Sequence, residues 1–328
     1  AILEIRKIDN KDWTNLFPTP KDWTNLFMIE IVDFPSLNVT LRGKLYRPES
    51  SADRLPVIVM AHGYSATING MVAERFAEVF CEAGFAVLLY DHYSFGISDG
   101  RPRRQINSWL QARGYCDAID YLLTRPEIDP QRIAVWGDSM SGWVAIVVGA
   151  VDDRVNAVVV QVPACGRKRP SAGPNEASYL AMKDIIRNRD LAAMAKDYAD
   201  PMPVVSADQI GMPSLLKPIT AFRWCMDYGA KYGTNWDNQA VLVTIDTGRP
   251  FHVHDCAAQL KTPILMVIAE DDEMPGANSD VARYVYDSIP APKELLEIDG
   301  GHFGLLYYPG ELFDQASRAQ RDFLLRHL

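Results

Sequence analysis

The sequence predicts an α/β fold, in which a mostly parallel central sheet carries helices on both faces. Three observations lead to this prediction. Short continuous apolar runs, typical of strands covered on both faces, alternate with segments of helical spacing. A serine flanked by glycines stands where one such run ends and a helix begins. A long segment of irregular pattern interrupts the alternation, which then resumes, so an insertion within one sheet is expected.

The expected elements follow in chain order. Residues 28–34 and 38–46 alternate between apolar and other side chains, and Pro35-Ser36 separate them, which indicates a β-hairpin. Buried strands are expected at 57–61, 85–91, 132–137, 155–162, 263–269 and 293–299. Helices are expected at 72–84, 108–123, 140–150, 278–288 and from about Glu311 to the end.

The regular pattern divides the chain into a core of 28–164 and 256–328 and an insertion of 165–255. The insertion is richer in Pro, Met and aromatic residues and contains helical pieces. Sheets of this kind place their sites at the carboxyl edge of the strands, so we expect a helical lid over that edge. Side chains expected to face the site are Met182, Phe222, Trp224 and Met226.

An N-terminal extension of 1–27 contains KDWTNLF twice, at 11–17 and 21–27. Two copies do not make a repeat architecture. One interpretation is an aromatic arm that packs on the body or on a second subunit, which leaves a homo-oligomer open. The other is a duplication in the sequence itself. Neither gives the extension a catalytic role.

Composition excludes several classes of function. The net charge of -9 at pH 7 opposes binding to the phosphate backbone of nucleic acids. No apolar run is long enough to span a membrane, and no signal peptide is visible. The five cysteines are odd in number, widely spaced and without a C-x-x-C pair, which argues against a disulfide framework and a structural zinc site. We therefore expect a cytoplasmic protein with reduced thiols.

The strongest chemical signal is GDSMSG at 137–142. The expected strand ends at Gly137 and the expected helix begins at Met140, so Ser139 stands on a sharp turn that exposes its hydroxyl. Small neighbours are needed there because larger side chains would collide with the strand and the helix. Ser141 replaces the last glycine of G-x-S-x-G and still meets this steric demand. The ordinary alternative is that Ser139 only caps a helix.

A second signal is His62-Gly63-Tyr64, directly after the strand at 57–61. Acyl transfer needs two backbone N–H donors for the oxyanion. Met140, which follows the nucleophile, should supply one, and Tyr64 the other. We expect the side chain of His62 to orient this loop rather than to react.

The base and the acid are expected later in the chain. His302 follows the strand at 293–299 between glycine and phenylalanine, and we expect it to act as general base. The loop after 263–269 offers the acid, since Glu270, Asp271, Asp272 and Glu273 stand in a row there, and the residues alone leave these four open. His252 and His254, beside Asp255, show no third-ligand pattern, so we expect no metal and interpret them as surface or lid residues.

These stretches resemble the α/β-hydrolase superfamily from about residue 30 to the end. The closer resemblance is to bacterial dienelactone-hydrolase-like and X-prolyl-peptidase-like hydrolases, through AHGYSA, LLYDHYSFGISDG, RPEIDPQRIAVWGDSMSG, VIAEDDEMP and DGGHF. The resemblance implies a Ser-His-Asp triad without a cofactor. By the spacing usual in such relatives it implies Asp272 as the acid, with Asp271 as runner-up. Dienelactone hydrolases proper use Cys as nucleophile, where this chain has Ser139.

The expected function is hydrolysis of a small-molecule carboxylic ester with a small or medium acyl group, through an acyl-enzyme on Ser139. Three alternatives stay open. The same triad could cleave an amide, a peptide or a carbon–carbon bond. An SGNH-type esterase would use the GDS block with Asp299-x-x-His302. A catalytically inactive α/β-hydrolase would serve as a binding protein.

Overall fold

The first two strands form a hairpin at one edge of the main sheet. The computed structural model describes residues 27–49 and 54–328, so both copies of KDWTNLF lie outside the described residues except for Phe27. Strands β1 (Phe27–Ser36) and β2 (Val39–Pro48) pair antiparallel with Ser36 opposite Val39. The turn, at Leu37-Asn38, therefore lies two residues later than the sequence indicated. Leu37 has a φ of 53° there, because a two-residue hairpin turn demands positive φ.

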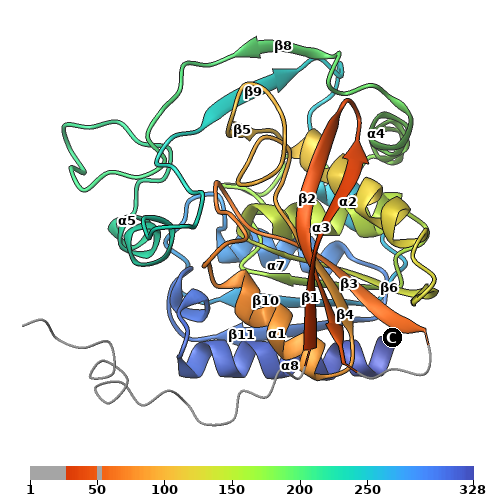
Figure 1. Ribbon diagram of the computed structural model, residues 1–328. Coiled ribbons are helices and arrows are strands. Elements are labelled where there is room, and N and C mark those ends of the chain that lie inside the picture. Colours follow the sequence, from red (N-terminus) through yellow and green to blue (C-terminus); the bar gives the residue numbers. More distant parts are fainter. Residues whose placement is uncertain (1–26, 50–53) are drawn as a thin grey trace, which may run out of the picture.

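Eight strands make up the main sheet, in the order β1-β2-β4-β3-β6-β7-β10-β11 (Figure 1). The two pairs made by β2 are antiparallel, and all the other neighbours are parallel. This confirms the predicted mostly parallel sheet. The remaining strands are β3 (Leu55–Ala61), β4 (Ala86–Tyr90), β6 (Ile128–Asp138), β7 (Ala157–Gln161), β10 (Ile264–Ala269) and β11 (Lys293–Ile298).

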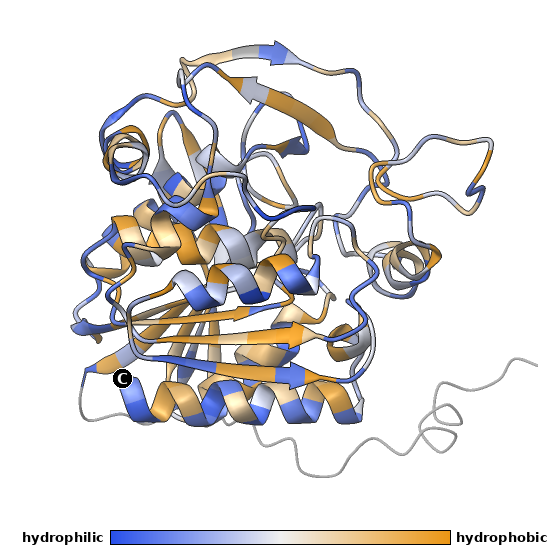
Figure 2. Ribbon diagram, turned by 180° about the vertical axis from the view of Figure 1, so that it is seen from behind, coloured by the Kyte–Doolittle hydropathy of each residue, from blue (hydrophilic) through white to orange (hydrophobic). Residues whose placement is uncertain are grey.

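Helices cover both faces of this sheet, and the strands between them are strongly hydrophobic (Figure 2). Helices α1 (Ala73–Glu82) and α8 (Glu311–His327) lie on one face. The other face carries α2 (Ser108–Leu122), α3 (Ser139–Val151) and α7 (Ser279–Ser288). Each face has its own apolar cluster. Helix α3 is buried almost all round, since it lies between the sheet and neighbouring helices, which explains its valine-rich composition.

The segment 165–255 forms an upper layer in Figure 1 and is less helical than expected. It contains the helices α4 (Glu176–Asn188), α5 (Ile219–Trp224) with a π-helical turn at Cys225–Gly229, and the start of α6 (Val253–Ala257). It also contains strands β8 (Ala195–Tyr198) and β9 (Val241–Ile245). Strand β9 pairs with β5 (Gln105–Ile106) of the core, so backbone hydrogen bonds tie the insertion to the body. None of the described helices is long and apolar enough to cross a membrane.

Candidate active site

Ser139 occupies a strained position at the junction of a strand and a helix. Strand β6 ends at Asp138 and α3 begins at Ser139, with no loop between them. The φ of Ser139 is 51°, in the left-handed region that favours glycine. A Cβ on Gly137 would lie 2.2 Å from the carbonyl oxygen of Ser141, and one on Gly142 would lie 3.1 Å from the Cα of Pro163. Glycine is therefore required at position 137, whereas a side chain at position 142 would need Pro163 to shift by a few tenths of an ångström. Backbone strain like that of Ser139 is characteristic of functional positions.

The structure brings Ser139, His302 and Asp272 into one hydrogen-bonded chain. His302 Nε2 lies 2.9 Å from Ser139 Oγ, and His302 Nδ1 lies 2.7 Å from Asp272 Oδ2. The side chains of His302 and Asp272 are each 2% exposed. With Nδ1–H donating to the carboxylate, Nε2 is left to accept the proton of Ser139. Asp271, the alternative acid, is exposed, and its backbone N–H donates to Gly300.

The SGNH alternative is rejected by this arrangement. It requires Asp299 as the partner of His302, whereas Asp272 holds that place and Asp299 is exposed. It also requires the serine near the start of the domain, whereas strands β1 to β4 of the sheet precede Ser139.

Glu273 is a supporting residue that the sequence reasoning did not single out. Its Oε2 accepts the backbone N–H of His302 at 2.7 Å, and its Oε1 accepts a short hydrogen bond from the hydroxyl of Thr220 in α5. A Cβ on Gly301 would lie 2.4 Å from Glu273 Oε2, so the glycine before His302 makes room for this carboxylate. Glu273 thus ties the imidazole-bearing loop to the insertion. The only signal for it was membership of the carboxylate row at 270–273.

A cavity of about 440 Å³ opens over Ser139 and His302. Tyr64 and Met140, the expected oxyanion residues, both line it, as do Arg167 and Lys217. Its apolar walls come from the core and from the insertion, and include Trp143, Leu215, Leu216, Trp224, Leu242, Met274, Phe303 and Leu306. Such a cavity suits an apolar group of moderate size.

Of the four insertion side chains expected to face the site, one lines the cavity. Trp224 lines the cavity, and its indole N–H donates to Leu306 at 2.8 Å. Met182 is fully buried beside Cys256, away from the cavity, and Phe222 and Met226 pack against the core cluster instead. The apolar periodicity of a helix shows which residues are buried, but it does not distinguish burial against a core from burial against a ligand.

A chain of hydrogen bonds connects the helix of Ser139 to the loop of Tyr64. The hydroxyl of Ser141 donates to the carbonyl of His62 at 2.5 Å and accepts from Nε2 of His92 at 2.8 Å. Burial lowers the pKa of His92 well below its ordinary value, so this ring is neutral, and its Nε2 carries the proton that is donated to the Ser141 hydroxyl. His62 Nε2 lies 3.0 Å from the buried carboxylate of Asp91. Ser141 therefore anchors the loop, and His62 has the orienting position expected of it.

Asp138 lies on the other side of the same loop and lines the cavity. The residue is 4% exposed, and the backbone N–H of Gly63 donates to its carboxylate. Within the described residues its Oδ1 has no hydrogen-bond partner. Burial raises the pKa of Asp138 to about 6, although the nearby rings of His62 and His302 favour the ionised form. A buried carboxylate that is only partly satisfied should cost stability when it is charged.

Asp138→Asn is therefore expected to stabilise the protein at pH 7.5, by about 3 kcal/mol at most. The sign follows from the raised pKa. Well below pH 4 the carboxyl is protonated in both states and costs nothing, and the cost grows as the pH rises from the unfolded pKa toward 6. Urea unfolding at a series of pH values measures the difference between the variant and the wild type. A gain that is equal at pH 4 and pH 7.5 would show that charge is not its cause.

Comparison with known proteins agrees with this geometry. The model of the X-Pro dipeptidyl-peptidase (S15 family) matches residues 38–200. A thiohydrolase, apmlB of Arthrinium phaeospermum, is 30% identical over 309 residues, which cover 91% of this chain and 97% of that protein. The α/β hydrolase GrgF from a Penicillium species has a TM-score of 0.68 at 24% identity, over 92% of this chain and 99% of the other.

A more distant structural neighbour is the dienelactone hydrolase of Anabaena variabilis, with a TM-score of 0.56 at 15% identity over 93% of this chain and 100% of the other. At that identity the likeness concerns the fold alone. The resemblance seen in the sequence motifs is thus found again in whole-chain similarity. The chain belongs to the α/β-hydrolase superfamily and is a hydrolase close to the S15 and dienelactone-type enzymes.

Proposed function

We propose that the protein is a serine hydrolase that cleaves carboxylic esters with an apolar acyl group of small or medium size. The observation that carries the proposal is the hydrogen-bonded chain from Ser139 through His302 to Asp272 at the wall of an apolar cavity. Ser139, His302 and Asp272 each make the hydrogen bond that a nucleophile, a general base and an orienting acid need. The segment 165–255 supplies part of that wall and serves as the lid.

In the proposed reaction, Ser139 Oγ attacks the ester carbonyl while its proton passes to His302 Nε2. The backbone N–H groups of Tyr64 and Met140 stabilise the oxyanion, and Asp272 stabilises the imidazolium. The C–O bond to the alcohol then breaks, and the alcohol leaves with the proton from His302. Water, activated by the same imidazole, hydrolyses the acyl-enzyme and releases the acid.

Thioesters are the second candidate substrate class, because the relative from Arthrinium phaeospermum is named a thiohydrolase. A thioester passes through the same tetrahedral intermediate, and the triad would act on it in the same way. The apolar walls would bind the same acyl group in both cases. The two candidates therefore differ only in the leaving group.

Matched substrates can separate these possibilities. Butyryl, hexanoyl, octanoyl and dodecanoyl groups are each presented as the p-nitrophenyl ester, the N-acetylcysteamine thioester and the p-nitroanilide. We expect kcat/KM to pass through a maximum with acyl length and the amides to react slowest. Preferential cleavage of the amides would favour the peptidase alternative. Absence of both turnover and fluorophosphonate labelling would instead favour an inactive binding protein.

Ser141→Ala is expected to lower kcat about 10- to 100-fold with little change in KM, because the loop of Tyr64 loses its anchor while the apolar walls stay intact. Steady-state kinetics with the preferred ester measure both constants. The affinity of an alkyl boronic acid, a mimic of the tetrahedral intermediate, should fall in parallel with kcat. Ser141→Gly is the matched variant, since it completes G-x-S-x-G but also lacks the hydroxyl. Wild-type kcat in Ser141→Gly would show that the anchor is not needed.

A further inference from the structure

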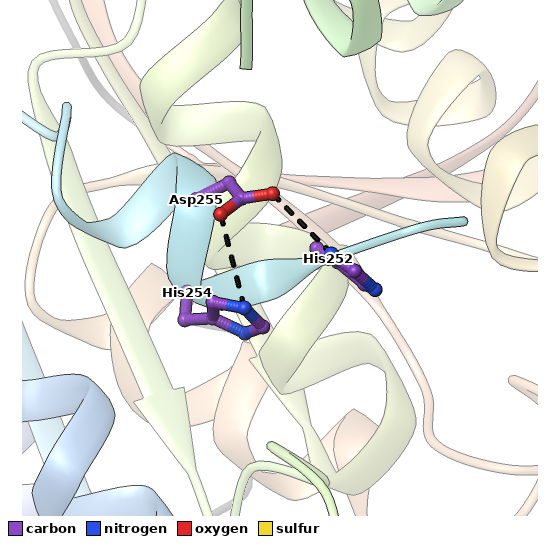
Figure 3. Close-up of side chains that lie close together, drawn as sticks. All are labelled: His252, His254 and Asp255. Carbon is purple, nitrogen blue, oxygen red and sulfur yellow. Dashed lines mark ion pairs between the residues drawn. The ribbon is translucent and has the colours of Figure 1, made fainter. Parts of the chain in front are cut away.

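A compact cluster of metal-binding side chains lies at the start of α6, outside the catalytic cavity. His252 immediately precedes the helix, and His254 and Asp255 lie in its first turn. Figure 3 shows the two oxygens of the Asp255 carboxylate directed at the two rings. Asp255 Oδ2 lies 3.3 Å from His252 Nδ1, and Asp255 Oδ1 lies 3.8 Å from His254 Nε2. In the sequence Asp255 stands beside the two histidines, and the fold directs its carboxylate at both rings.

The buried carboxylate of Asp255 favours a bound cation at this position. Its side chain is only 3% exposed, and within the described residues its ion-pair partners are the two histidines, with no Arg or Lys among them. The backbone N–H of Asn175 donates to its Oδ1 at 2.9 Å and holds the carboxylate in this orientation. A buried carboxylate is stabilised by a nearby positive charge, and a cation bound between the carboxylate and the imidazoles would supply one.

We propose that His252, His254 and Asp255 bind a divalent first-row transition ion such as Zn²⁺. Two imidazole nitrogens and one carboxylate are a usual donor set for zinc, and neighbouring ligands of a tetrahedral site with bonds of about 2.1 Å lie roughly 3.4 Å apart. Here each imidazole lies near a different carboxylate oxygen, at 3.3 and 3.8 Å, and one ligand atom from each of the three residues lies within 4.8 Å of the others, so a bound ion would draw these atoms together by about an ångström or less. Three protein ligands leave one position for water. The side chain of His252 is 42% exposed, and the cluster lines a second cavity of about 610 Å³, which gives the ion a route of entry.

The location suggests what a bound ion would do. Asn175, whose N–H holds Asp255, is also the N-cap residue of α4, so the ion would fasten α6 to the start of α4 within the insertion. Phe251, next to His252, packs against Trp109 and Trp143 at ring-centroid distances of 5.1 and 5.6 Å. Trp143 lines both cavities. The proposed role is therefore structural, and it does not depend on the reaction proposed for Ser139.

The test measures binding of Zn²⁺ to the full chain, produced without a histidine tag and dialysed against a chelator. Isothermal titration calorimetry should show one saturable site, and the melting temperature should rise with zinc concentration. His252→Ala and His254→Ala should each weaken binding by at least about tenfold. Co²⁺ should give the visible absorption of a low-symmetry site in the wild type and lose it in both variants.

His327→Ala is the matched control, because His327 lies 3.9 Å from a carboxylate oxygen of Glu294 and is not among the described residues that line the cavity at His252 and His254. It should bind zinc as the wild type does. The side chain of His252 is partly exposed, so its replacement by alanine is expected to leave folding intact and to keep the test decisive. Wild-type affinity in both His252→Ala and His254→Ala, or no saturable binding to the wild type, would overturn the proposal.

Discussion

Ser139→Ala is expected to abolish ester hydrolysis, with a fall in kcat of at least about three orders of magnitude. The residue lies at the strained turn between β6 and α3, and its Oγ is 2.9 Å from the imidazole that would take its proton. Alanine has no nucleophile to offer, yet it adds no atom that could clash with its neighbours. The variant should therefore keep its melting temperature. Steady-state hydrolysis of the preferred p-nitrophenyl ester measures the loss.

Labelling by a fluorophosphonate probe provides the control for this substitution. Wild type should be labelled stoichiometrically, Ser139→Ala not at all, and Ser141→Ala slowly but completely, since its nucleophile is intact. Ser141 is fully buried in the hydrogen-bonded chain to His62 and His92. If Ser139→Ala kept most of its activity and Ser141→Ala lost all labelling, the nucleophile would be misassigned.

Asp272→Asn should lower kcat by about 10³- to 10⁴-fold. The carboxylate lies 2.7 Å from His302 Nδ1 and is shielded from water, so it determines which ring nitrogen carries the proton. An amide in its place can donate to Nδ1 and would favour the tautomer with the proton on Nε2, which cannot accept from Ser139. The imidazolium formed during attack would also lose its counter-charge. Kinetics at saturating ester measure the effect on kcat directly.

Asp271→Asn is the matched control, because it makes the same chemical change one residue earlier in the same loop. The side chain of Asp271 is exposed, so activity should change by less than about twofold. Equal losses in the two variants would mean that the loop's total charge matters rather than the contact with His302. A large loss in Asp271→Asn alone would transfer the role of acid to that residue.

Much of this architecture could be predicted from local patterns. Strands such as β3, β4 and β10 are buried on both faces, and their unbroken apolar runs showed this without any knowledge of their neighbours. The turn at Ser139 was also predictable, because a Cβ on Gly137 would collide with the backbone of Ser141 and Gly142, a few residues later in the same turn. These features depend on steric contacts between residues close in the chain, so they are visible in the local sequence pattern.

The identity of the triad acid could not be predicted from the local sequence pattern. Four consecutive carboxylates follow β10, and the residues themselves did not distinguish among them. In the folded chain Asp271 faces solvent, Asp272 faces the imidazole and Glu273 holds the backbone of His302. These directions depend on the backbone path of an irregular loop and on the position of a partner about 30 residues later. No periodicity describes that path, so the resemblance to known hydrolases, and not the pattern, pointed to Asp272.

The sequence by itself determined the main-sheet strands and the long helices of the core, the turn that bears Ser139 and the loop that bears His302, since each depends on neighbours in the chain. Only the tertiary structure decided which insertion side chains face the catalytic cavity, because Met182 and Trp224 are both buried and differ only in what covers them. It also decided that Asp255 is directed at both histidines beside it. In both cases the direction of a side chain is set by packing against residues distant in sequence, which a pattern of hydrophobicity does not encode.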